Sequence, residues 1–230
     1  MSSTDPHSES PFNALPPVVV LLALAIVGVE VVLQLGERGL VGGPEAVGWR
    51  LALIQRFSVV PELFRAMWTQ GTWPPEHLLR LVAYPFIHAS FGHAIFVIVF
   101  ILALGKMVAE IFAAWAVLVV FFGASIVSGL VYSLVLPSQM PLFGGYPAAY
   151  GLIGAFTFLL WTRLAASGGP QARAFFLIGF LMAFQLLFGL LFGGGLDWVG
   201  DLAGFATGFL LSFVVSPGGW ARVMDRLRQR

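Results

Sequence analysis

The sequence predicts an all-α membrane protein built as a bundle of six membrane-spanning helices. Composition is the first observation, because 59% of the 230 residues are hydrophobic and only 10% are charged. Soluble domains carry about 25% charged residues. The second observation is that the apolar residues form long runs. Each run is close to the length of about 20 residues that a helix needs to cross a bilayer. The mean hydropathy of +0.92 agrees with both observations.

The net charge and the lack of cysteine exclude several classes of function. A net charge of +1 gives no electrostatic reason to expect a nucleic-acid partner. Because the chain has no cysteine, disulfides, thiolate zinc sites and a cysteine nucleophile are excluded. We therefore expect the lipid bilayer as the surrounding partner, no nucleic acid and no cofactor.

The N-terminal part of the chain contains a polar tail and the first span. Residues 1–14 lack the basic region of a cleaved signal peptide, and we expect a disordered tail. The first span runs over residues 15–35, with two prolines tolerated in its opening turn. Glu30 lies inside this span, where an ionisable group is a functional candidate. We expect the simpler role, in which Glu30 reaches the interface or a polar residue of the next loop.

Residues 36–76 are too charged to span a membrane and too apolar to be a plain solvated loop. Apolar and aromatic residues are interspersed there with arginines and glutamates, which predicts one or two amphipathic helices in the membrane interface. Trp49 and Trp68 suit the level of the lipid headgroups. The segment is therefore predicted to be an interfacial first loop.

Five further spans are predicted after this loop, at residues 78–104, 111–136, 148–161, 174–192 and 196–215. The short span at 148–161 suits a helix that starts below the membrane surface, under a wet cavity. All six spans belong to one predicted domain over residues 15–216, which a basic tail follows at 217–230.

The distribution of basic residues predicts the orientation of the chain. Six spans put both termini on one side, together with Lys106, Arg163, Arg173 and the four tail arginines. The opposite loops, around 136–145 and 193–197, contain no lysine or arginine. The positive-inside rule therefore places both termini in the cytoplasm. The arginines of the first loop depart from this pattern, and an amphipathic element with its own acids would account for them.

Small residues mark two spans as closely packed helices. A turn of sequence GGYP at 144–147 leads into a helix with small residues along one side, and a GxxxG pair lies in the last span. Small residues three and four positions apart let membrane helices approach closely. The predicted packing residues are Gly144, Gly151, Gly154, Gly204 and Gly208.

These two stretches, together with the segment FIHASFGH at 86–93, resemble the core of the rhomboid family of intramembrane serine proteases. In that family a Gly-x-Ser motif opens the fourth span, and a His-x-x-Gly-x-x-x-Gly motif forms the sixth. The resemblance covers roughly residues 79 to 215. It implies a rhomboid-like bundle of six helices whose large first loop lies partly in the membrane.

Three positions that carry chemistry in that family hold other residues here. Tyr146 takes the place of the nucleophilic serine, and Asp201 takes the place of the histidine base. Val97 stands where an asparagine helps to bind the oxyanion. A phenol titrates near pH 10, and an aspartate is a poor proton shuttle at neutral pH. Losing one triad member costs on the order of 10⁴ in rate, so we expect no catalytic residue.

The resemblance also implies that His88 and His93 line a cavity together with Tyr146 and Asp201. Two histidines five residues apart, without an acidic or cysteine partner at metal spacing, do not predict a zinc site. We expect Tyr146 to donate a hydrogen bond to Asp201 in place of the serine–histidine pair. Ser90 lies near both histidines and is the alternative nucleophile, although membrane hydroxyls commonly bond back to their own helix.

Three functions follow from these patterns. The first is a non-catalytic pseudoprotease that binds transmembrane segments of client proteins, because inactive rhomboids and derlins resemble this chain in keeping the scaffold without the dyad. The second is an active rhomboid-type serine endopeptidase that uses an unrecognised nucleophile. The third is a small-solute transporter or channel, which Glu30, Asp201 and the two histidines would suit. Against the third, the chain shows no broken helices in corresponding halves.

Overall fold

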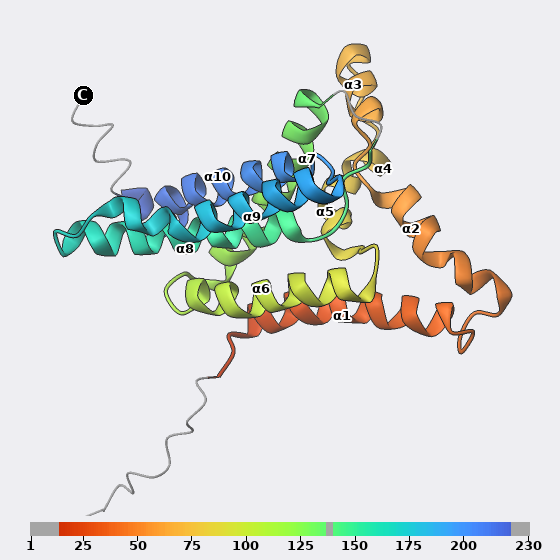
Figure 1. The fold of residues 1–230 in the computed structure, drawn as a ribbon, viewed down its shortest axis with the longest axis horizontal. Coiled ribbons are helices and arrows are strands. Elements are labelled where there is room, and N and C mark those ends of the chain that lie inside the picture. Colours follow the sequence, from red (N-terminus) through yellow and green to blue (C-terminus); the bar gives the residue numbers. More distant parts are fainter. Residues whose placement is uncertain (1–13, 137–139, 222–230) are drawn as a thin grey trace, which may run out of the picture.

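The fold is a bundle of long helices with a smaller helical arm on one side (Figure 1). The computed structural model describes residues 14–136 and 140–221. Six helical segments of this part are long and apolar enough to cross a membrane, which confirms the predicted number of spans. Residues 1–13 of the predicted N-terminal tail and residues 222–230 of the basic tail lie outside the described residues. The long helices are α1 (Pro17–Glu37), α6 (Phe91–Ala109), α7 (Ala114–Val135), α8 (Tyr146–Ala166), α9 (Phe176–Phe192) and α10 (Trp198–Val215).

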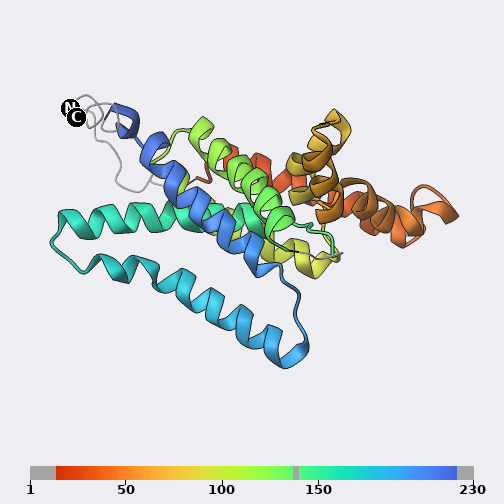
Figure 2. The ribbon, with the colours of Figure 1, turned by 90° about the horizontal axis from the view of Figure 1, so that it is seen from above.

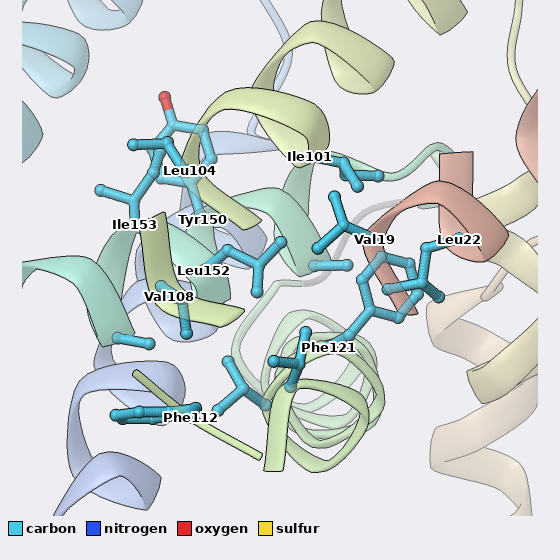
Figure 3. Packing of buried hydrophobic residues seen from close by; sticks show 14 of the residues in the cluster. Val19, Leu22, Ile101, Leu104, Val108, Phe112, Phe121, Tyr150, Leu152 and Ile153 are labelled. Carbon is cyan, nitrogen blue, oxygen red and sulfur yellow. The ribbon is translucent and has the colours of Figure 1, made fainter. Parts of the chain in front are cut away.

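Helix α8 lies at the centre of the bundle. It packs against α6, α7 and α10, while α1 covers the far side of α6 (Figures 1 and 2). The largest apolar cluster forms where α1, α6, α7 and α8 meet, and Figure 3 shows its side chains interlocking there. Leu152 and Ile153 of α8 are fully buried in this cluster, which also contains Val19 of α1 and Ile101 of α6. Helix α8, whose first residues belong to the candidate site, is therefore packed against other helices over most of its surface.

Glycines allow the backbones of α8 and α10 to touch. A Cβ atom added to Gly208 would lie 1.9 Å from the carbonyl oxygen of Gly151. One added to Gly204 would lie 2.2 Å from the carbonyl oxygen of Pro147, and one added to Gly154 would lie 2.1 Å from that of Phe205. Real Cβ atoms do not approach backbone atoms this closely, so only glycine fits at these contacts. The sixth span therefore lies directly against the start of the fourth.

The second span is shorter than the sequence pattern predicted. The prediction began it at residue 78, whereas α6 begins at Phe91. The apolar residues before it form short helical pieces, because Pro85 lacks an N–H group and Ser90 caps α6 by accepting a hydrogen bond from the His93 N–H at 3.2 Å. These pieces are α4 (Pro75–Leu78), α5 (Arg80–Ala83) and η2 (Tyr84–Phe86).

The fourth span is longer than predicted. It was placed at residues 148–161, but α8 starts at Tyr146 and continues to Ala166. Pro147 is compatible with a first turn, and Arg163 lies in the last turn, where a cation interacts favourably with the helix C-terminus. The prediction ended the helix at Trp161, before Arg163, and therefore made it too short.

The segment between α1 and α6 forms the arm that projects in Figure 1. It contains η1 (Pro44–Gly48), α2 (Trp49–Phe57) and α3 (Pro61–Gln70). Its residues Val59 and Leu142 exchange both main-chain hydrogen bonds at 2.9 Å. The Arg80 guanidinium donates to the carbonyl oxygen of Ser58 at 2.9 Å. The arm is therefore fastened to the loop that precedes α8.

A buried ion pair fastens α2 to α1. Arg50 donates to both carboxylate oxygens of Glu30, at 2.8 and 2.9 Å, and its remaining N–H groups reach Glu37 and the carbonyl oxygen of His88. Hydrogen bonding to Glu30 raises the pKa of Arg50 above its usual value. Glu30 thus has the structural role expected from its place near the end of the first span.

Helix α9 differs from the other spans because it is barely packed. Of its residues, only Ile178 is buried. Figure 2 shows α9 diverging from α8 after the turn that contains η3 (Gln171–Phe175). The distance between α9 and α8 grows toward the C-terminal end of α9 (Figure 2).

Candidate functional site

The candidate site forms where the segment before α6, the turn before α8 and the first turns of α10 meet. Gly144 has a φ angle of +94°, which favours glycine. Its N–H donates to the Tyr84 carbonyl oxygen at 3.0 Å. A Cβ atom here would lie 2.7 Å from the His93 ring. The turn therefore needs glycine both for its conformation and for the space beside His93.

His88 is fixed as a neutral acceptor under this turn. It is 1% exposed, and its Nε2 accepts a hydrogen bond from the Gly145 N–H at 3.2 Å. Burial lowers the pKa of His88 to about 3, so the ring carries no charge at neutral pH. Because Nε2 is already occupied by a main-chain donor, His88 is poorly placed to take a proton from a nucleophile.

Tyr146 meets His93 as an aromatic stack. The two ring centroids are 5.1 Å apart with an interplanar angle of 22°. The His93 Nδ1 accepts a long hydrogen bond, 3.4 Å, from the Ala89 N–H. Val97, one turn further along α6, is fully buried against Gly145. Val97 therefore brings an apolar side chain against the turn that precedes α8.

Asp201 finds its partner on α9. Its Oδ2 accepts a hydrogen bond from the Gln185 side-chain amide at 2.8 Å, and the Gln185 carbonyl oxygen accepts one from the Tyr150 hydroxyl at 3.4 Å. The predicted bond from Tyr146 is wrong, because the Tyr146 ring turns toward His93 instead. Within the described part of the chain, the Asp201 Oδ1 atom is buried and has no hydrogen-bond partner.

A cavity of about 880 Å³ opens between α6, α9 and the starts of α8 and α10. Tyr146 and Asp201 line it, whereas His88 and His93 are not among its lining residues. Most of the wall is apolar and comes from α6 and α9. The residues that line it are Phe96, Phe100, Tyr146, Tyr150, Leu181, Phe184, Gln185, Leu186, Phe188, Gly189, Leu190, Phe192, Gly194, Gly195, Leu196, Asp197, Trp198 and Asp201.

The serines of the spans are engaged with the main chain. Ser125, Ser128, Ser133 and Ser212 are fully buried. Each donates its hydroxyl to a carbonyl oxygen at 2.7 to 2.8 Å. Ser128 does so across helices, to Gly200 at the start of α10. These hydroxyls hold helices together and are not directed at a base.

The sequence alone did not reveal three polar residues of the cavity: Tyr150, Gln185 and Asp197. Gln185 is the one strongly polar residue in the apolar sequence of α9, and this was the available signal. Burial raises the pKa of Asp197, which precedes α10, above its usual value. Among residues 14–136 and 140–221, no group of three or more His, Asp or Glu side chains is arranged to hold a metal ion.

Replacing Gln185 by leucine is expected to release α9 from the bundle. The substitution removes the hydrogen bond to Asp201, and an interhelical bond in a membrane contributes about 0.6–1.7 kcal/mol. Because the chain has no cysteine, spin labels can be placed at exposed Leu190 and Leu210 alone. Double electron–electron resonance should show a longer and broader distance distribution, with Leu187→Ala as the control on the same helix. An unchanged distribution would contradict the role of the Gln185–Asp201 hydrogen bond in holding α9 against the bundle.

The comparison with protein families agrees with this arrangement of helices. A family model described as Rhomboid domain matches residues 75–218, which is more than half of the chain. The matched region contains α6 to α10 and therefore every residue of the cavity. No curated protein matches the chain.

Proposed function

This chain belongs to the rhomboid family, and we propose that it is a non-catalytic member that binds transmembrane segments of client proteins. A serine-type mechanism needs a nucleophile within hydrogen-bond reach of a base, about 2.6–3.2 Å. The observation that carries the proposal is that the two residues at the positions of the family's serine and histidine have different partners. Tyr146 stacks on His93, while Asp201 is bonded to Gln185. The two side chains therefore do not form a nucleophile–base pair.

The remaining polar groups support the absence of proteolysis. The four serine hydroxyls that are buried within the spans donate to main-chain carbonyl oxygens. Ser90 serves as the N-cap of α6, and the Nε2 atom of His88 is already bonded. Val97 offers no donor for an oxyanion. An active protease would have to break several of these contacts before a hydroxyl and a base could meet.

The cavity supports client binding. Helix α9 leaves it open on one side of the bundle, and phenylalanines of α6 and α9 form much of its wall. A transmembrane helix of another protein is apolar and can pack against such a wall in the bilayer. The close backbone packing between α8 and α10 holds together the two helices that carry Tyr146 and Asp201 of the cavity.

We propose one domain over residues 15–216 with both termini in the cytoplasm. Lys106 lies near the end of α6, and Arg163 lies near the end of α8. The loops at the opposite end of these helices carry no lysine or arginine at 136–145 and 193–197. The positive-inside rule then assigns the cavity end of the bundle to the outer side of the membrane.

Site-specific photocrosslinking tests client binding. A benzoylphenylalanine at position 184 lies in the cavity wall, whereas one at position 176, on the same helix, lies outside it. Both variants are reconstituted with a panel of single-span test proteins. We expect the crosslinker at position 184 to form adducts with some of these helices, and the crosslinker at position 176 to give only background. Equal yields from both positions would overturn the proposal.

A further inference from the structure

The charges of the cavity are all of one sign. Asp197 and Asp201 are its acidic lining residues, and no lysine, arginine or histidine is among the described residues that line it. Gln185 bonds to Asp201 through a neutral amide, so it does not compensate the charge of an ionised carboxylate. A group that enters this cavity is therefore favoured if it brings a positive charge.

Asp201 has unused capacity to accept hydrogen bonds. The residue is only 2% exposed, and its Oδ1 atom has no hydrogen-bond partner in the described part of the chain. A carboxylate oxygen can accept two hydrogen bonds, and an acid within a span is expensive unless it is paired. Asp201 lines the cavity, so a group that enters the cavity is in a position to supply a donor to this carboxyl group.

The phenylalanines of the cavity wall limit which groups can donate a hydrogen bond to Asp201. Phe180, Phe184, Phe188 and Phe192 form a ladder along α9, with successive ring centroids 6.2, 4.3 and 5.4 Å apart. The last three of these rings line the cavity. Such a wall suits an apolar helix, and it also suits the aliphatic stem of a lysine or arginine. Aromatic faces attract a cation as well.

We propose that the cavity selects partner helices that carry a lysine or arginine within the span, and that Asp201 is the counter-ion of this basic side chain. This inference rests on the proposed client binding and specifies the class of client. Asp201 lies in the first turn of α10. The basic residue should therefore lie about one helical turn inside the membrane boundary at the cavity end.

A peptide pair tests this proposal in zwitterionic liposomes, where the lipid itself does not attract a cation. Two fluorescent single-span peptides are identical except for one lysine or one glutamine at the depth of Asp201. Energy transfer to the labelled protein gives their apparent Kd values. We expect the lysine peptide to bind at least about tenfold more tightly, which corresponds to about 1.4 kcal/mol. In Asp201→Asn, which keeps the shape of the side chain, the preference should fall to within about twofold.

The controls separate failure of this inference from failure of the proposed function. If both peptides bind equally to the native chain, selection by charge is wrong and client binding stands. If neither peptide binds, the proposed function itself is contradicted. A lysine preference that persists in Asp201→Asn would exclude Asp201 as the counter-ion. A peptide with glutamate at the same position should bind less tightly than the glutamine peptide, and this comparison needs no variant of the protein.

Discussion

Replacing Arg50 by alanine is expected to lower the free energy of unfolding by about 3–5 kcal/mol, the usual cost of breaking a buried ion pair by removing one partner. Arg50 makes the two hydrogen bonds to Glu30 and also bonds to Glu37 and to the His88 carbonyl oxygen. Its loss leaves the Glu30 carboxylate buried within a span without its cation. Unfolding by SDS titration in mixed micelles measures the change.

Two comparisons give this prediction its controls. Arg56 lies on the same helix and is exposed, so Arg56→Ala should change stability by no more than about 0.5 kcal/mol. Adding Glu30→Gln to Arg50→Ala removes the unpaired charge, and the double variant should be more stable than Arg50→Ala alone. Equal effects of Arg50→Ala and Arg56→Ala would show that the ion pair does not anchor the first loop.

Gly208→Ala is expected to prevent the native contact between α8 and α10. The added methyl group would lie 1.9 Å from the carbonyl oxygen of Gly151, so the two backbones have to separate. Overpacking usually costs about 1–3 kcal/mol and occasionally more. We expect a cost at or above the upper end of this range, because the clash is with backbone and no side chain can rotate away.

Gly28→Ala is the matched control for this substitution. Gly28 lies in α1, and an added Cβ atom would meet nothing within 4 Å. Alanine is more favourable than glycine in a helix by about 1 kcal/mol, so Gly28→Ala should be neutral or stabilising. Gly208→Ala should instead lower the thermal unfolding midpoint in detergent. A Gly208→Ala protein as stable as the native chain would contradict the close packing of the two helices.

Much of the fold could be predicted because each span carries its own signal. Apolar length alone indicated the six spans, and a charge inside the first span indicated a partner for Glu30. The start of α6 could not be found this way, since residues 78–90 are also mostly apolar. There the missing N–H group of Pro85 and the N-cap formed by Ser90 decide where the helix begins. A hydropathy pattern detects neither of them.

Only those residues of the candidate site that lie in recognisable motifs could be predicted. Tyr146 and Asp201 were identified from their positions in the motifs, and both line the cavity. The partner of Asp201 depends on how α9 is rotated and tilted relative to α10, which no local pattern encodes. Pairing Asp201 with Tyr146 was reasonable by position, but the stack with His93 directs the Tyr146 ring elsewhere. Gln185 then provides the hydrogen bond.

The most direct test of a non-catalytic role is a cleavage assay with the purified chain in liposomes. A model transmembrane substrate and a serine-reactive fluorophosphonate are added, and an active rhomboid protease is run in parallel as the positive control. We predict neither cleavage nor labelling of the native chain, and crosslinking to the uncut helix instead. Cleavage that survives Tyr146→Phe would reveal another nucleophile, and cleavage that Tyr146→Phe abolishes would make the phenol catalytic. Either result would contradict a pseudoprotease.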